Sequence, residues 1–575
     1  MGSSHPAGPI RLFPSPGRTQ EKISVPLTIL DATCARFTDT GAVWLFDAPS
    51  AGQGLKEDMI VDRLRSSFIT TLDDFPQWAG QLHWAPFWPE IGNHTERWQR
   101  CMLTYGGIND DCDDPGVEWS VVRRNYALDS IAPSSSSSRS NDVWWDNDAF
   151  PQQELISPTN LALANLKDWQ GLPCMSVQIT MFTCGGYGVG VRLAHPIADA
   201  QSMMVFMHKW AANCRSAQQQ TPSSSLFGEP VFDPPRLDAR AVGDIDSADG
   251  PDPELCAKAR ALPMHRFSWW DMDAPGYSPY LVGKTKNNMP PADVLAKTTL
   301  SPSTTAPWHT WDLARPAASV ILHFTGEELS RLRERARAET TANGDSDNSS
   351  ISRSDALLAH LFRLVTQARC SVKSSSYAPG ADDEVFLNYT LEARRRVEPP
   401  LPETFLGSPL FMTHIKAPAA SILLSQPETQ RAPNGLTNGA TTTTTGALAR
   451  QLRKTLQQFT PDAVAALLHE STFEVAPQRL WRGFLGPRHV IVTSWLRTRL
   501  YDVDFGFASA GESQDQDEGG SRRRRPRYVH AVMDKADGIL VLLDPVVDDG
   551  GVDVAVYLDA EAMGELRELV KTTPI

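Results

Sequence analysis

Apolar and polar residues alternate along two neighbouring stretches in the first half of the chain. Residues 177–181 and 187–193 both show this period of two, and the pair Gly185-Gly186 lies between them. A period of two is typical of strands, and a glycine pair between two such runs indicates a tight turn. The pattern therefore predicts a β-hairpin.

The period changes to that of a helix after the hairpin. Apolar residues from Met203 to Trp210 follow the i, i+3, i+4, i+7 spacing of one helical face. Asp199 stands where a carboxylate would cap the first turn of this helix. His195 lies between the second strand and the cap, so we expect its ring at a strand-to-helix junction that faces a cleft.

The pattern His-x-x-x-Asp has little specificity without this context, because the chain also contains it from His530 to Asp534. Residues 527–532 contain no glycine-paired hairpin, and residues 533–538 are typical of a turn. We therefore predict that His530 is a structural residue.

Similar patterns predict further elements in both halves of the chain. Expected strands cover residues 23–30, 42–46, 318–324, 539–543 and 552–557. Expected helices cover residues 64–75, the segment after a Thr325–Glu328 capping box, a segment from Asp355 capped by Ser352 or Ser354, and the segment after Asp559. This mixture predicts an α/β (α+β) protein of two similar-sized lobes.

The length of 575 residues exceeds what one ordinary core accommodates. We expect a flexible tail at residues 1–22, a first domain at 23–216, a crossover linker at 217–306 where the periodic pattern weakens, and a second domain at 307–575.

Charge and cysteine content narrow the class of protein. The net charge of −14 argues against nucleic acid and anionic membranes as partners. None of the eight cysteines has Cys-x-x-Cys or zinc-ligand spacing, so we expect a reduced compartment and no metal. A basic leader and a membrane-spanning run are missing from the sequence, which favours a cytoplasmic protein, expected to be a monomer.

Five passages of the sequence coincide, in order, with the motifs of one family. They are residues 75–82, 182–199, 351–360, 394–407 and 493–508. Together they resemble the BAHD acyl-CoA-dependent acyltransferases, which carry a His-x-x-x-Asp and an Asp-Phe-Gly-Trp-Gly motif. The resemblance covers roughly residues 23–570 and is greatest to the fungal branch, near relatives of trichothecene 3-O-acetyltransferases.

This resemblance implies a chloramphenicol-acetyltransferase-like fold, in which each of two domains is a mixed β-sheet with flanking helices. It also implies an O-acyltransferase that uses acyl-CoA, with acetyl-CoA expected, as a co-substrate and holds no permanent cofactor. The acceptor would be a hydroxyl of a hydrophobic secondary metabolite. His195 would be the general base in a tunnel between the domains, and the alcohol would attack the thioester directly.

The resemblance also implies roles for residues around this base. A helix-capping Asp199 would point at backbone N–H groups, so we expect a structural role in which it pairs with Arg394. Asp504 and Gly506 would shape the loop near the coenzyme.

Three further residues, Thr493, Trp495 and Phe507, would line the substrate pocket, although plain core packing is an alternative for Trp495. The chain departs from the family pattern at Ala200, Ser408, Phe507 and Ala508.

Other readings of the sequence stay open. The same base would serve transfer to an amine. A carrier-protein-dependent condensation enzyme of this fold usually has two adjacent histidines, whereas Ala194 precedes His195 here. A non-catalytic ligand-binding or scaffold protein is the third alternative. Cys184 is expected to be a buried strand thiol and not a nucleophile.

Overall fold

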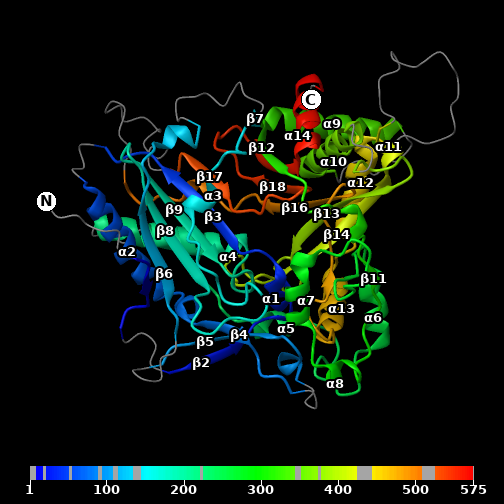
Figure 1. Ribbon diagram of the computed structural model, residues 1–575, viewed down its shortest axis with the longest axis horizontal. Coiled ribbons are helices and arrows are strands. Elements are labelled where there is room, and N and C mark those ends of the chain that lie inside the picture. Colours follow the sequence, from blue (N-terminus) through cyan, green and yellow to red (C-terminus); the bar gives the residue numbers. More distant parts are fainter. Residues whose placement is uncertain are drawn as a thin grey trace.

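The protein is represented by a computed structural model (Figure 1). It describes residues 8–16, 21–50, 55–88, 93–107, 114–133, 144–219, 224–342, 351–372, 377–423, 443–507 and 525–573.

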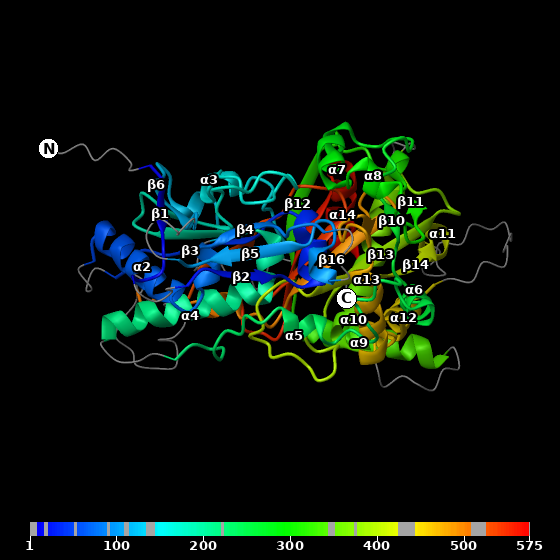
Figure 2. The same cartoon turned by 90° about the horizontal axis from the view of Figure 1, so that it is seen from below.

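A six-stranded sheet forms the centre of the first half of the molecule. Its order is β1 (Ile10–Leu12), β6 (Val117–Arg123), β8 (Met175–Met181), β9 (Tyr187–Leu193), β3 (Thr40–Phe46) and β17 (Tyr528–Ala531). Neighbouring strands are antiparallel except β6 and β8, which are parallel. Helix α4 (Ala200–Gln219) runs along one face, with α2 (Glu57–Leu72) packed beside it (Figure 2).

A seven-stranded sheet forms the centre of the second half. Its order is β14 (Leu410–Pro418), β13 (Glu384–Glu392), β16 (His489–Trp495), β18 (Ile539–Leu543), β19 (Val552–Asp559), β12 (Ala317–Phe324) and β7 (Trp144–Trp145). Helix α10 (Arg353–Ser371) packs against α9 (Gly326–Ala342), α12 (Thr445–Gln457) and α14 (Ala560–Thr572). Figure 1 shows α9, α10 and α14 gathered on the outer side of this sheet.

Two three-stranded sheets and shorter helices complete the described part of the chain. One small sheet has the order β2 (Ile23–Pro26), β5 (Cys101–Tyr105) and β4 (Gln81–Trp84). The other has the order β11 (Thr304–Thr305), β10 (Phe267–Ser268) and β15 (Leu480–Trp481). The shorter helices are α1 (Ile29–Thr33), α3 (Gln152–Leu155), α5 (Pro235–Asp238), α6 (Pro253–Arg260), α7 (Val282–Asn288), α8 (Ala292–Leu295), α11 (Ala419–Leu423) and α13 (Pro461–Thr472).

Each large sheet includes one strand from the other half of the chain, so the residue ranges expected for the two domains do not coincide with the two sheets. Strand β17 comes from the second half but pairs with β3, and β7 comes from the first half but pairs with β12. The expected linker at 217–306 carries helices α5 to α8, and its strand β10 pairs with β15. The halves are therefore joined by pairing as well as by the crossover.

Two expectations at the N-terminus were wrong. The presumed tail contains β1, which pairs with Val117–Trp119 and so gains a sheet partner. The strand expected over residues 23–30 ends at Pro26, and α1 follows it. A capping box between Thr28 and Asp31 starts that helix by satisfying free backbone N–H groups.

Most of the other predicted elements are confirmed. The strands expected at 42–46, 318–324, 539–543 and 552–557 are present as β3, β12, β18 and β19. Ser352 caps α10 and Asp559 caps α14. The helix expected over residues 64–75 is α2, which ends at Leu72, while Phe75 is buried in the following turn.

No helix in the described ranges is long and apolar enough to span a bilayer.

Candidate active site

His195 lies where the hairpin of β8 and β9 meets helix α4, as the residue pattern predicted. It begins a short 3₁₀ turn, His195–Ile197, directly after the end of β9. The ring is half-buried and lines a cavity of about 1070 Å³ between the two halves of the molecule. The imidazole is therefore accessible to a bound small molecule.

A single hydroxyl fixes the protonation pattern of this ring. Ser408 Oγ lies 2.5 Å from the backbone oxygen of His195 and 3.1 Å from His195 Nδ1. A hydroxyl has one proton, and a carbonyl oxygen only accepts. Ser408 therefore donates to the carbonyl and accepts from Nδ1–H, which leaves Nε2 of the neutral ring as the unprotonated nitrogen.

Asp31 holds the loop that carries Ser408 in place through a hydrogen bond. Ser408 N donates to Asp31 Oδ1 at 2.5 Å. Burial raises the pKa of Asp31 to about 7, against the opposing effect of hydrogen bonds from Ser408 and Thr28. Gly407 has φ +135°, and a Cβ there would lie 2.8 Å from Asp31 Oδ1, so only glycine fits this close approach.

The surroundings of the ring favour its neutral form. Burial lowers the pKa of His195, and the more distant charges of Asp199 and Asp39 only partly oppose this effect. The Phe37 ring contacts the imidazole edge-on, with 5.3 Å between centroids. A neutral imidazole at cellular pH is the form that accepts a proton.

Asp199, which lines the same cavity as His195, forms a buried ion pair with Arg394. Its carboxylate accepts from Arg394 Nη1 at 2.6 Å and Nη2 at 2.9 Å. Asp199 Oδ1 also accepts from Ser202 N at 2.9 Å, so the residue caps α4. Arg394 additionally donates from Nε to the Phe405 carbonyl at 3.0 Å. The pair joins the start of α4 to the segment between β13 and β14.

Both halves of the chain line the cavity, and its wall is rich in aromatic side chains. Thr493 and Trp495, at the end of β16, are part of the lining. The aromatic lining residues include Trp269, Trp311, Tyr389, Trp481, Phe484 and Trp495.

Three residues expected near the substrates do not line this cavity. Phe507 is buried and packs edge-on against Tyr187, with 5.9 Å between ring centroids. Gly506 has φ +85°, and its N–H donates to Asp504 Oδ1 at 2.7 Å, which closes the turn before Phe507. Phe507 therefore packs in the hydrophobic core and, contrary to the expectation, does not line the cavity. Ala508 lies outside the described residues.

Two other sequence interpretations have clear outcomes. His530 is buried in β17 and stacks on Phe150 with 4.1 Å between centroids, as a structural histidine does. Burial lowers its pKa to about 3. The expectation for Cys184 was wrong, because the hairpin turn already includes this residue and leaves it exposed.

Sequence reasoning missed the roles of two residues near His195. Ser408 was noted only as a departure from a motif, and Arg36, which also lines the cavity, carried no local signal. Among the described residues no group of three or more His, Cys, Asp or Glu side chains is placed to hold a metal ion.

Comparisons with known proteins identify the family. A sequence model described as the Transferase family matches residues 106–254 and 317–572. Acyltransferase AFT15-1 of Alternaria alternata is 27% identical over 477 residues, which cover 80% of this chain and 78% of the relative. Acyltransferase abl6 of Leptosphaeria maculans is 26% identical over 504 residues, which cover 87% of this chain and 85% of that relative.

Solved structures share the fold. Vinorine synthase superposes with a TM-score of 0.54 at 17% identity, over 99% of this chain and 98% of its own. F. sporotrichioides TRI101, complexed with coenzyme A and T-2, gives a TM-score of 0.57 at 15% identity, over 95% of this chain and 97% of the TRI101 chain. The two-sheet architecture, the family match and the acyltransferase relatives agree. The chain belongs to the Transferase family of BAHD acyltransferases, in its fungal branch, and is an acyl-transferring enzyme.

Proposed function

We propose that this enzyme transfers an acyl group, with acetyl expected, from acyl-CoA to a hydroxyl of a hydrophobic secondary metabolite, with His195 as the general base. The observation that carries the proposal is the unprotonated Nε2 of His195, imposed by Ser408 beside a cavity of about 1070 Å³. That volume exceeds the upper end of typical small-molecule sites, about 1,000 Å³, and accommodates two substrates.

The chemistry follows from this geometry. The acceptor O–H donates to Nε2, and its oxygen attacks the thioester carbon as the proton moves to the ring. The C–O bond forms, the C–S bond breaks, and the imidazolium returns the proton to the departing thiolate. The products are the ester and the free thiol of coenzyme A, and no covalent bond to the protein forms.

The remaining residues act on this reaction indirectly. The Asp199–Arg394 pair positions the turn after β9, since Asp199 is engaged with a guanidinium and a helix N-terminus. Thr493 and Trp495 bound the space where acyl group and acceptor meet. Asp504 and Gly506 shape a neighbouring loop.

Coenzyme A as the donor is supported by the family and by the TRI101 structure, which is a complex with coenzyme A. The aromatic wall supports a hydrophobic acceptor. The acceptor class and the preference for acetyl are part of the proposal.

The test follows the release of free thiol from acetyl-CoA in the presence of a panel of alcohols. We expect His195→Ala to lower turnover at least about 10²-fold, the lower range for a positioned general base. His309→Ala, at an exposed histidine that does not line the cavity, is the matched control and should retain turnover. Equal turnover in the His195 and control variants would refute the assignment of the base.

Transfer to an amine is the second candidate. One relative, from Avena sativa, is named hydroxycinnamoyl-CoA:5-hydroxyanthranilate N-hydroxycinnamoyltransferase HHT4 and is 24% identical over 554 residues. The same base would accept a proton from an amine. A parallel panel of amines in the thiol assay distinguishes the two acceptors.

A further inference from the structure

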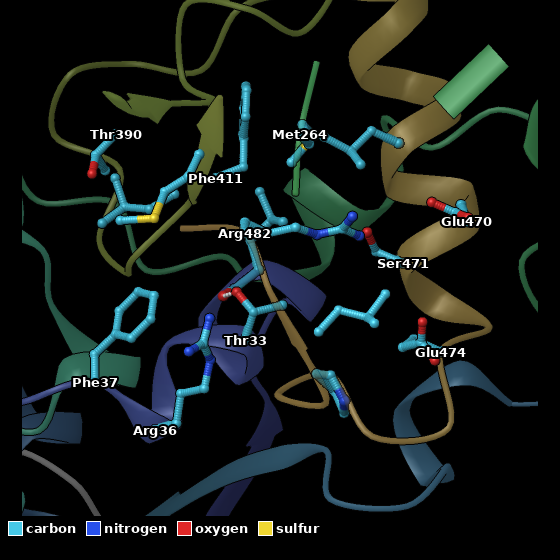
Figure 3. Close-up of a pocket in the computed structure, with 16 residues that line it drawn as sticks. Thr33, Arg36, Phe37, Met264, Thr390, Phe411, Glu470, Ser471, Glu474 and Arg482 are labelled. Carbon is cyan, nitrogen blue, oxygen red and sulfur yellow. Dashed lines mark hydrogen bonds between the residues drawn. The ribbon is translucent and has the colours of Figure 1, made fainter. Parts of the chain in front are cut away.

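Arg36 places a positive charge beside the candidate active site. It ends the short 3₁₀ helix Cys34–Arg36, and its guanidinium lies 4.8 Å from the Phe37 ring centroid and 5.0 Å from that of Trp481. Figure 3 shows the guanidinium between Phe37 and Thr33, at the edge of a side pocket. This pocket shares Arg36 and Phe37 with the lining of the large cavity.

This guanidinium has no anionic partner within the described part of the chain. Its Nε is buried without a hydrogen-bond partner, and no described carboxylate forms an ion pair with it. Burial lowers the pKa of Arg36 to about 9. Arg394 is more deeply buried, at 3% exposed, yet Asp199 raises its pKa. The pKa values of the two arginines shift in opposite directions because Arg394 has a carboxylate partner and Arg36 has none among the described residues.

The carboxylates of the side pocket are already engaged elsewhere. Glu470 pairs with Arg260 at 2.6 Å and with Arg266 at 2.9 Å. Glu474 pairs with Arg479 at 2.9 Å. Neither glutamate forms an ion pair with Arg36, so the charge of Arg36 has no carboxylate partner among the described residues that line the pocket.

A second arginine contributes positive charge to this pocket. Arg482 lines the same pocket, donates from Nη1 to the His265 carbonyl at 3.3 Å, and has a pKa that burial lowers to about 10. In Figure 3 its side chain extends toward Ser471. The pocket holds about 50 Å³, several times the ~10–15 Å³ that one ordered water needs. A planar carboxylate fits both this space and the fork of a guanidinium.

Phe37 connects this pocket with the base, because its ring contacts both Arg36 and His195. We propose that Arg36, together with Arg482, binds a carboxylate carried by a substrate whose reacting group lies at His195. This inference rests on the proposed acyl transfer and deepens it: either the acceptor is a hydroxy acid, or the acyl group is that of a dicarboxylic acid monothioester. A buried cation without a partner is costly, and the substrate would supply the missing charge.

The experiment measures binding, not turnover, by calorimetry with one ligand at a time. The acceptor arm compares 4-(hydroxymethyl)benzoate with its methyl ester, and the acyl arm compares malonyl-CoA with acetyl-CoA. We expect the acid to bind at least about tenfold more tightly in one arm, because only the carboxylate gains charge-assisted hydrogen bonds to the guanidinium. Arg36→Met should abolish that preference, and Arg36→Lys should keep part of it.

Arg331→Met is the control, because it removes the same charge from an exposed position on α9. Arg482→Met should weaken the preference and keeps the test decisive if Arg36→Met fails to fold. Equal binding of acid and neutral ligand in both arms, or a preference that survives in Arg36→Met, would overturn the inference. Failure of the proposed function is a separate result, namely no thiol release with any acceptor, and it would leave the binding data interpretable.

Discussion

Replacing Arg394 by methionine isolates the buried ion pair that holds the turn of His195. The variant breaks both contacts to Asp199, at 2.6 and 2.9 Å, and leaves a carboxylate whose residue is only 4% exposed. Removing one partner of a buried pair costs about 3–5 kcal/mol, because the other charge remains buried without compensation. In a cooperative unit of 150–250 residues this lowers Tm by roughly 6–20 °C.

The double variant Arg394→Met/Asp199→Asn is the matched comparison. Asparagine still caps a helix, so the hydrogen bond from Ser202 N is kept while the buried charge is removed. We therefore expect the double variant to regain at least about 1 kcal/mol relative to Arg394→Met alone.

Urea unfolding followed by tryptophan fluorescence measures these changes, and thiol release from acetyl-CoA measures activity in parallel. An Arg394→Met protein as stable as the wild type would refute the structural account of the pair. A fall in kcat for Asp199→Asn without loss of stability would show that Asp199 takes part in the chemistry and does not only position the turn.

Three further predictions concern hydroxyl and imidazole groups. Ser408→Ala should lower kcat roughly 5- to 150-fold, because the buried Nδ1–H of His195 loses its acceptor at a cost of ~1–3 kcal/mol; Ser408→Asn should retain more activity, and full activity of the alanine variant would contradict the tautomer assignment. Because burial lowers the pKa of His195 below 6.5, the pH profile of kcat/KM should stay level through pH 6.5 and fall only below it, and an acidic limb centred above 6.5 would contradict the base. Burial, with a smaller effect of neighbouring cationic groups, lowers the pKa values of His265, His414 and His489 to about 2, 4 and 3. The unfolded chain therefore binds more protons, and stability should fall as pH drops from 6.5 toward these values; urea midpoints that do not change between pH 7 and 5 would contradict this.

The position of His195 followed from local sequence, but the group that orients it did not. The alternation of β8 and β9, the glycine turn and the cap at Asp199 all lie within one short stretch and act locally. Ser408 is 213 residues away and meets His195 only because the two halves pack together. Sequence pattern has no access to such a contact.

The errors of the sequence analysis have related causes. Strands β1 and β17 are short pieces at sheet edges, and each is stabilised by a partner distant in the chain. Strand formation depends on such context more than on intrinsic preference. The end of β2 could have been predicted from the sequence, because Thr28 and Asp31 form a local capping box. The apolar run over these residues was instead interpreted as a continuous strand. For Cys184 the glycine turn simply extends further than the alternation suggested.

The two nitrogens of His195 thus depend on different parts of the molecule. Nδ1 faces Ser408, which stands with Arg394 in the segment between β13 and β14, so its hydrogen bond exists only when the second half is docked on the first. Nε2 is left for the cavity, whose wall combines aromatic side chains with Arg36. Changes at Ser408 should therefore act mainly on the base, whereas changes at Arg36 should act mainly on which substrate is bound. Activity and selectivity are then separable by mutation, because Ser408 hydrogen-bonds to the imidazole directly whereas Arg36 reaches it only through Phe37.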